Sequence, residues 1–209
     1  MKNEDRMSIR VLIVEDEPVI ATDIEMTLTG EDYDVVGIAY TSTKAIDMLH
    51  RVQPDLVLLD IAIKGDRNGI DIARIINDKY HVPFIYITSF SDRETLERAK
   101  ATLPYGYIVK PFKDSDIISA IQMAIHRHAT DNNRQFPSIR EINSLTPLTK
   151  GEYQVMKCVW EGSTNLQVTE QLHISLNTVK THLKSVFIKL EVNSRSAAIA
   201  AIRNMKRGS

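Results

Sequence analysis

DLVLLD, residues 55–60, is the stretch of sequence that decides the fold of this chain. A short, unbroken apolar run of this kind is typical of a strand buried on both faces of a parallel sheet. Three further apolar runs, at 9–14, 84–87 and 107–109, are also followed by or end in polar residues. The carboxyl ends of parallel strands lie at one edge of an open α/β sheet, where chemistry is usually found. We therefore expect Asp60 to face a functional site at that edge.

Helical patterns alternate with these strands along the first 128 residues. One more strand is predicted at 35–39, and apolar residues at helical spacing predict a helix after each strand. Strands that alternate with helices at short spacing favour a parallel sheet with helices on both faces. The sequence thus predicts a doubly wound, five-stranded α/β domain. Its expected helices run from Pro18 to a stop at Gly30, over 43–51 and 70–80, from a cap at Ser91 to Lys100, and over a last stretch that buries Ile117, Ile118, Ile121, Ala124 and Ile125.

Polar residues at the four strand ends predict a phosphoryl-accepting site. They are Glu15, Asp16, Asp60, Thr88 and Lys110. Magnesium prefers oxygen ligands, so Asp16 and Asp60 are candidate direct ligands, with Glu15 acting through water. A carboxylate can attack phosphorus, while a metal ion and a lysine neutralise the phosphoryl oxygens. We assign the nucleophile to Asp60 and the cation to Lys110, and expect Thr88 to donate a hydrogen bond to a phosphoryl oxygen.

Ala62 bears on the alternative that this domain is an enzyme. Its backbone carbonyl is placed to contribute to a metal site, whatever its side chain. Phosphatases with an aspartate nucleophile usually carry a second Asp two residues later, and here that position is Ala62. Neither Ala62 nor Phe90 offers a polar group to orient an attacking water. We therefore expect a phosphoryl acceptor with at most slow self-dephosphorylation, and hydrolysis of small phosphate esters would revive the enzyme alternative.

Charge divides the chain into two modules. Residues 1–128 hold 15 Lys and Arg against 21 Asp and Glu, whereas residues 145–209 hold 9 against 4. An acidic front joined to a basic tail suggests that the second module faces a polyanion. The single cysteine, Cys158, excludes an internal disulfide or a cysteine-rich zinc site. The charged start and the lack of any membrane-length apolar run predict a cytoplasmic protein with no membrane partner.

The second module reads as helical throughout. A short helix at about 165–171, a turn and a longer helix capped by Ser175 form the helix-turn-helix arrangement. In the longer helix an apolar stripe faces the core, and basic and polar residues occupy another face. The candidate DNA-binding residues are Asn177, Thr178, Lys180, Thr181, Lys184 and Lys189, the last of which we expect to meet phosphate. On composition alone, a merely solvated helix is the favoured interpretation of Lys180 and Lys184.

The first module resembles the receiver domain of two-component response regulators over about residues 8–128. The matching motifs are Val14-Glu15-Asp16-Glu17, Leu59-Asp60, Thr88-Ser89 and Tyr107-Ile108-Val109-Lys110-Pro111-Phe112. The resemblance implies a flavodoxin-like fold and a partner histidine kinase that phosphorylates Asp60. It also implies that Thr88 and Tyr107 form a switch pair. Gly69 lies nine positions after Asp60, one more than in the commonest receivers.

The second module resembles the LuxR/NarL/FixJ-type DNA-binding domain over about residues 146–207. The most specific match is Thr178-Val179-Lys180-Thr181-His182. The resemblance implies a four-helix domain whose third helix enters the major groove and whose last helix dimerises. Leu166 and Gln167 stand where Lys and Glu are usual, so one backbone contact is missing. Residues 129–145, which are polar and lack apolar periodicity, read as a linker between the two domains.

The whole sequence therefore predicts a response regulator whose binding to double-stranded DNA depends on phosphorylation at Asp60 and on Mg²⁺. Phosphorylation is expected to shift an equilibrium between two receiver surfaces. It would either release the DNA-binding domain or promote a homodimer, and the sequence leaves both routes open. The alternative is an adaptor that acts by protein contact, with a helical domain of weak or lost DNA affinity. DNA binding that responds to salt would distinguish the two.

Overall fold

The computed structural model describes residues 7–29, 32–89, 93–131 and 136–205. Its contacts divide the chain into two compact units: one is Arg10–Ile125, and the other joins residues 7–9 to the described residues from His126 onward. Each unit is described by itself below. Among the described residues, no helix is both long enough and apolar enough to cross a membrane.

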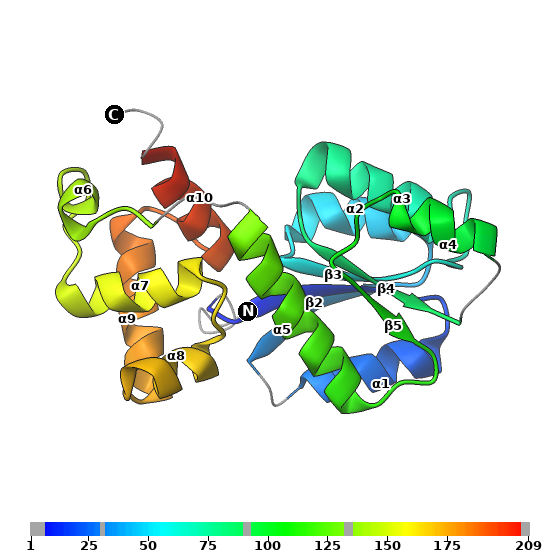
Figure 1. The fold of residues 1–209 in the computed structure, drawn as a ribbon, viewed down its shortest axis with the longest axis horizontal. Coiled ribbons are helices and arrows are strands. Elements are labelled where there is room, and N and C mark those ends of the chain that lie inside the picture. Colours follow the sequence, from blue (N-terminus) through cyan, green and yellow to red (C-terminus); the bar gives the residue numbers. More distant parts are fainter. Residues whose placement is uncertain (1–6, 30–31, 90–92, 132–135, 206–209) are drawn as a thin grey trace. The chain divides into compact units, whose positions relative to one another are not determined.

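The first unit contains a sheet of five strands in the order β2-β1-β3-β4-β5. The pairs β1–β3, β3–β4 and β4–β5 are parallel. Helices cover both faces, with α2 and α3 on one side and α1 and α5 on the other (Figure 1). The predicted doubly wound fold is confirmed. The strands are β1 (Ile9–Val14), β2 (Tyr33–Ala39), β3 (Leu56–Asp60), β4 (Phe84–Thr88) and β5 (Gly106–Val109).

Every residue of β3 and of β4 is buried, as expected for the centre of a parallel sheet. Alternate side chains pack on opposite faces. On one face Leu12, Val57 and Leu59 join a core cluster with Leu49 and Ile72 from the covering helices. The apolar run that decides the fold thus forms the central strand, and Asp60 is its last residue.

Local sequence sets where the helices of this unit begin. A proline occupies the first turn of α1, the Thr41 side chain accepts from the amide of Lys44 at the start of α2, and Asn68 forms a capping box with Asp71. These helices are α1 (Pro18–Leu28), α2 (Ser42–Val52), α3 (Gly69–Ile75), α4 (Arg93–Lys100) and α5 (Asp114–Asp131).

One helical prediction differs from the structure in detail. The helix expected over 70–80 is α3 followed by a π-helical segment, η1 (Ile76–Tyr80), which ends where the amide of His81 bonds the carbonyl of Ile76. His81 has a left-handed φ of 54°, which stops the helix. The cap predicted at Ser91 and the stop at Gly30 fall outside the described residues.

The segment expected to be a linker contains ordered structure. Helix α5 continues to Asp131, and α6 (Ile139–Asn143) begins with a capping box between Ser138 and Glu141. Ile142 is buried in the core of the second unit. The ring of Phe136 lies 5.2 Å from that of Tyr153, centroid to centroid. Residues 136–145 therefore pack with the second unit, although too few apolar residues recur there to give a periodic signal.

The second unit continues with α7 (Lys150–Trp160), α8 (Asn165–Leu172), α9 (Leu176–Lys189) and α10 (Arg195–Met205). The side chains of Thr149, Thr164 and Ser175 cap the first three of these helices. Val179, Leu183 and Val186 of α9 are fully buried. The four predicted helices and the apolar stripe of the third are confirmed, and the opposite side of α9 remains available to solvent.

Candidate functional site

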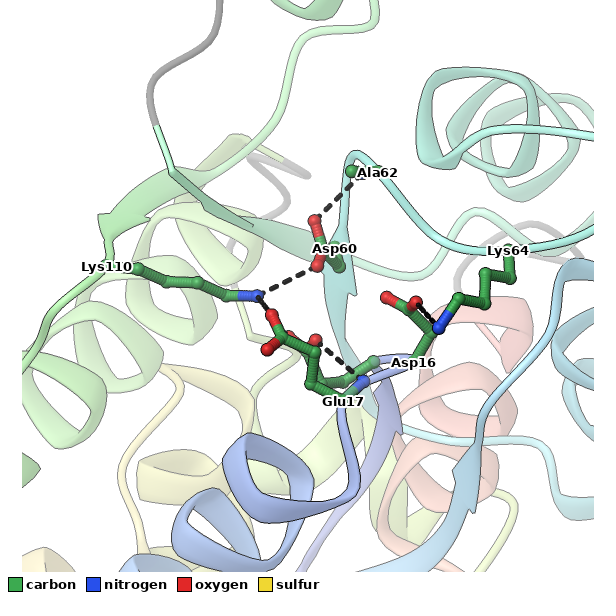
Figure 2. Close-up of polar contacts among 7 residues, drawn as sticks. Asp16, Glu17, Asp60, Ala62, Lys64 and Lys110 are labelled. Atoms are coloured by element: carbon green, nitrogen blue, oxygen red, sulfur yellow. Dashed lines mark hydrogen bonds and ion pairs between the residues drawn. The ribbon is translucent and has the colours of Figure 1, made fainter.

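Three carboxylates gather at the carboxyl edge of the sheet (Figure 2). Glu15 and Asp16 directly follow β1, and Asp60 ends β3. Each offers an oxygen, and these oxygens all lie within 4.8 Å of one another. Glu15 is fully buried and Asp60 nearly so. Hard oxygen donors this close together fit a divalent cation such as Mg²⁺.

Lys110 lies directly after β5 and reaches across the cluster. Its Nζ is 2.8 Å from Oε2 of Glu15 and 2.9 Å from Oδ2 of Asp60. Burial alone lowers the pKa of Lys110, but these two carboxylates outweigh burial and raise it, so the ammonium keeps its charge. Burial raises the pKa of Glu15 to about 7, against the opposing effect of Lys110. We call Glu15, Asp16, Asp60 and Lys110 the rim. The rim thus places a fixed cation beside the predicted phosphoryl acceptor.

Backbone groups orient Asp60 and Thr88. The amide of Ala62 donates to Oδ1 of Asp60 at 2.8 Å, which leaves Oδ2 facing Lys110. Thr88 is buried at the end of β4, and its carbonyl accepts from the amide of Lys110 at 2.9 Å. Asp60 pairs in register with Ile87, the residue before Thr88. The structure therefore brings the sequence-predicted acceptor, hydroxyl and lysine to neighbouring strand ends. A metal contact through the Ala62 carbonyl stays a prediction.

Tyr107, the predicted switch aromatic, lies on β5 beside Tyr86 of β4. Their ring centroids are 5.7 Å apart. The Tyr107 hydroxyl is buried and has no hydrogen-bond partner among the described residues. The Tyr86 hydroxyl lies 2.9 Å from Oγ1 of Thr102, which itself donates to the carbonyl of Ala99. Sequence reasoning missed this support beneath Tyr107, because a tyrosine inside a buried strand reads as ordinary core.

The loop after Asp60 closes at its base. The amide of Gly69 donates to the carbonyl of Ile61 at 2.9 Å, and a Cβ at Gly69 would come within 2.1 Å of the Asp60 carbonyl oxygen. Helix α3 therefore begins against the backbone of the acceptor strand. Within this loop, Nζ of Lys64 lies 2.9 Å from Oδ2 of Asp16. Sequence analysis did not single out Lys64, since a lysine in a polar loop carries no signal.

Most of the predicted DNA-binding residues are accessible on α9. Asn177, Thr181 and Lys184 are exposed, and Thr178 and Lys180 are partly exposed. The Thr178 hydroxyl lies 2.9 Å from that of Ser175, so it also supports the cap of the helix. The arrangement presents polar and basic groups along one side of a helix whose other side is core, as major-groove recognition requires.

Lys189 is engaged inside the second unit. Its Nζ lies 2.6 Å from Oε2 of Glu152 on α7. Burial by itself raises the pKa of Glu152, but hydrogen bonds from Lys189, Ser185 and Thr149 outweigh burial and lower it to about 2. The phosphate contact predicted for Lys189 remains untested, and the observed ion pair gives this lysine a role in joining α7 to α9.

Two family models match the two halves of the chain. The response regulator receiver domain matches residues 11–122, and the luxR family of bacterial regulatory proteins matches residues 146–202. This chain is a LuxR-family response regulator. Both families are regulatory, which is in line with the expectation of a phosphoryl acceptor rather than an enzyme.

The response regulator is similar to several known proteins. It is 41% identical over 118 residues to the transcriptional regulatory protein PdtaR of Mycobacterium tuberculosis, and that match covers 56% of this chain and 57% of PdtaR. It is 28% identical over 200 residues to the response regulator protein VraR of Staphylococcus saprophyticus, covering 92% and 95% of the two chains. The chain thus spans little more than half of the first relative and nearly all of the second.

A solved structure shows the same fold along most of the response regulator. It is RcsB from Salmonella enterica serovar Typhimurium, bound to promoter rprA in the presence of a phosphomimetic. The TM-score is 0.50 and the sequence identity is 21%, and the likeness covers 93% of this chain and 99% of that chain.

Proposed function

We propose that a partner histidine kinase phosphorylates Asp60 and that phosphorylation controls sequence-specific DNA binding by α9. The observation that carries the proposal is the contact of Asp60 with Lys110 beside the carboxylates of Glu15 and Asp16. A buried carboxylate held between a fixed ammonium and a set of metal ligands suits phosphoryl acceptance. The receiver family implies the kinase partner.

The residues of the rim divide the work of phosphoryl transfer. Oδ2 of Asp60 attacks the phosphorus of the kinase's phosphohistidine, the P–N bond breaks and the histidine imidazole leaves, while Lys110 neutralises negative charge on the phosphoryl oxygens. Asp16 and Asp60 would hold Mg²⁺ directly, with Glu15 acting through water and the Ala62 carbonyl as a further ligand. When bound, the ion supplies additional positive charge for the transferring group. Thr88 donates to a phosphoryl oxygen and Tyr107 turns with it, which shifts the receiver between two surfaces.

The DNA-binding half of the proposal rests on α9 and on dimerisation. Asn177, Lys180, Thr181 and Lys184 would face base edges or phosphates in the major groove, and Thr178 would orient the start of the helix. Phosphorylation promotes a homodimer, and two copies of α9 then occupy paired half-sites. RcsB, which shares the fold, has been solved bound to a promoter, and this supports the DNA-binding part of the proposal.

The test is selection of DNA from a random pool by the full chain, with and without acetyl phosphate and Mg²⁺. Parallel arms use Asp60→Ala and the double variant Lys180→Ala, Lys184→Ala. As a matched control, Lys157→Ala removes an exposed lysine of α7, which pairs only weakly with Glu161 at 3.8 Å.

The proposal predicts enrichment of a paired site that needs the phosphodonor, Asp60 and the two α9 lysines. Enrichment that ignores the phosphodonor would retain DNA binding and reject the switch. If no arm enriches any DNA sequence, an adaptor that works by protein contact is favoured.

A further inference from the structure

We propose that Lys64 is a tethered cation that competes with Mg²⁺ for Asp16 and so sets how much Mg²⁺ the receiver needs. The inference rests on the metal site proposed above and adds a residue to it. Lys64 lies in the loop after the acceptor strand, four residues beyond Asp60. Neither its position nor the loop it occupies is part of the sequence motifs that identify the receiver.

The contact is directed at one oxygen of an expected metal ligand. Nζ of Lys64 lies 2.9 Å from Oδ2 of Asp16. Figure 2 shows Lys64 and Lys110 approaching the acidic cluster from opposite sides. Lys110 contacts Glu15 and Asp60, whereas Lys64 contacts Asp16. In this arrangement each of the three carboxylates has an ammonium group beside it.

The two lysines differ in how easily they can be displaced. The side chain of Lys110 is 10% exposed and is held by two buried carboxylates. The side chain of Lys64 is 74% exposed, while that of Asp16 is only 12% exposed. Lys64 can therefore leave Asp16 and become solvated at little cost, whereas Asp16 stays at the rim. Lys64 has the properties of a competitor that an incoming ion can replace.

Hydrogen bonds hold the backbone around Lys64 in place, so that its side chain faces Asp16. The carbonyl of Lys64 accepts from the amide of Ser42 at 2.9 Å, and the Ser42 hydroxyl accepts from the amide of Arg67 at 3.4 Å. Gly65 has a φ of 131°, and a Cβ there would lie 2.2 Å from the Ser42 hydroxyl oxygen. The loop is thus clamped to the start of α2 by contacts that need glycine after Lys64. Only the side chain of Lys64 has to move when it releases Asp16.

Simple electrostatics gives the direction and size of the effect. An ion bound at about 2.1 Å from an Asp16 oxygen needs the lone pairs that the ammonium uses, and it repels that ammonium. Measured exposed ion pairs correspond to changes of up to about fivefold in an equilibrium constant. We therefore expect removal of the Lys64 charge to raise Mg²⁺ affinity about two- to fivefold.

The experiment measures ion binding by the full, unphosphorylated chain. Free Mn²⁺ is followed by electron paramagnetic resonance, and Mg²⁺ is then added as the competitor. The variants are Lys64→Met, which removes the charge, and Lys64→Arg, which retains it. Lys44→Met is the matched control, because Lys44 is also an exposed lysine near the start of α2 but pairs with Asp47. Asp16→Asn tests the metal site itself.

The expected result is tighter Mg²⁺ binding by Lys64→Met alone, with Lys64→Arg and Lys44→Met close to wild type. Equal or weaker binding by Lys64→Met, in a wild-type protein that does bind Mg²⁺ and loses it in Asp16→Asn, would overturn the role of Lys64 and leave the proposed function intact. If the wild type binds neither ion, the metal site proposed above fails, and the inference fails with it.

Discussion

Among the described residues, Lys110 is the only cation that contacts both Glu15 and Asp60. Replacing it by methionine leaves buried carboxylates without their cation, which typically costs about 3–5 kcal/mol. We expect Lys110→Met to lower the free energy of unfolding of the metal-free receiver by about 3 kcal/mol, the low end, because Glu15 can take up a proton. Mg²⁺ should recover part of the loss, because it binds the folded form.

Calorimetric unfolding with and without Mg²⁺ measures this effect. Lys113→Met serves as the control, because Lys113 is exposed. A Lys110→Met protein as stable as the control variant would contradict the interpretation of Lys110 as the shared counter-ion.

Glu191 follows α9 in a left-handed conformation, with a φ of 56°. This conformation costs a residue with a Cβ about 1–2 kcal/mol relative to glycine. Glycine would be more flexible in the unfolded chain, which offsets part of the gain. We therefore expect Glu191→Gly to stabilise the second unit by about 0.5–1 kcal/mol, measured by urea unfolding followed through Trp160 fluorescence. Glu191→Ala removes the charge but keeps the Cβ, and a gain equal to that of glycine would refute the conformational explanation.

At the scale of single residues, sequence could predict the groups that end strands. Asp60 and Lys110 were predictable because buried strands deliver their last residues to one edge. Lys64 was not, because its partner, Asp16, lies far away in sequence and is reached only through the clamp on Ser42. For the same reason the sequence predicted a phosphate contact for Lys189 and gave no sign of its ion pair with Glu152.

Helices α7 and α9 are joined through Glu152, whose pKa is lowered to about 2 from an ordinary value near 4.5. A carboxyl group with a lower pKa in the folded state stabilises the protein fully above its unfolded pKa. That contribution is lost as pH falls from about 4.5 toward 2. We expect the second unit of the wild type to lose stability in this window faster than that of Glu152→Gln, whose uncharged side chain cannot titrate.

Urea midpoints from Trp160 fluorescence between pH 5 and pH 2.5 give the comparison. Glu161→Gln is the control, because Glu161 is half exposed and makes only a 3.8 Å ion pair with Lys157. Parallel pH profiles for wild type and Glu152→Gln would show that Glu152 does not carry the acid sensitivity of this unit.

For the helices and strands, the sequence could predict that the long ones exist, but not the short helix α6 or the π-helical end of α3. The five strands and the four helices after residue 149 follow from apolar periodicity, which long elements display clearly. The short helix α6 contributes Ile142 to the core, and one turn of helix is too short to show a period. The π-helical segment η1 ends at the left-handed backbone of His81, which apolar periodicity does not reveal.

The charge asymmetry of the whole molecule has a measurable consequence. Each phosphate that a lysine neutralises contributes about 0.9 to the slope of log affinity against log salt. We expect the double variant Lys180→Ala, Lys184→Ala to bind the selected DNA more weakly and with a slope smaller by about 1–2. Fluorescence anisotropy over a salt series measures it, and Lys157→Ala should keep the wild-type slope. An unchanged slope in the double variant would assign the phosphate contacts to other residues.

The division into an acidic receiver and a basic helical domain was predictable for the whole molecule, because composition changes along the chain. The ends of the segment that connects the two domains were not predictable, because Phe136 and Ile142 pack in the helical core although the stretch around them is mostly polar. Sequence therefore identified what each half is, while the packing of the segment between them needed the structure.

The hydrogen bond between Gly69 and Ile61 separates the loop after Asp60 from the frame that carries the acceptor. This hydrogen bond fixes the two ends of the loop to each other. Because Ile61 follows Asp60 directly and Gly69 is the first residue of α3, this single bond fixes the start of α3 to the end of β3.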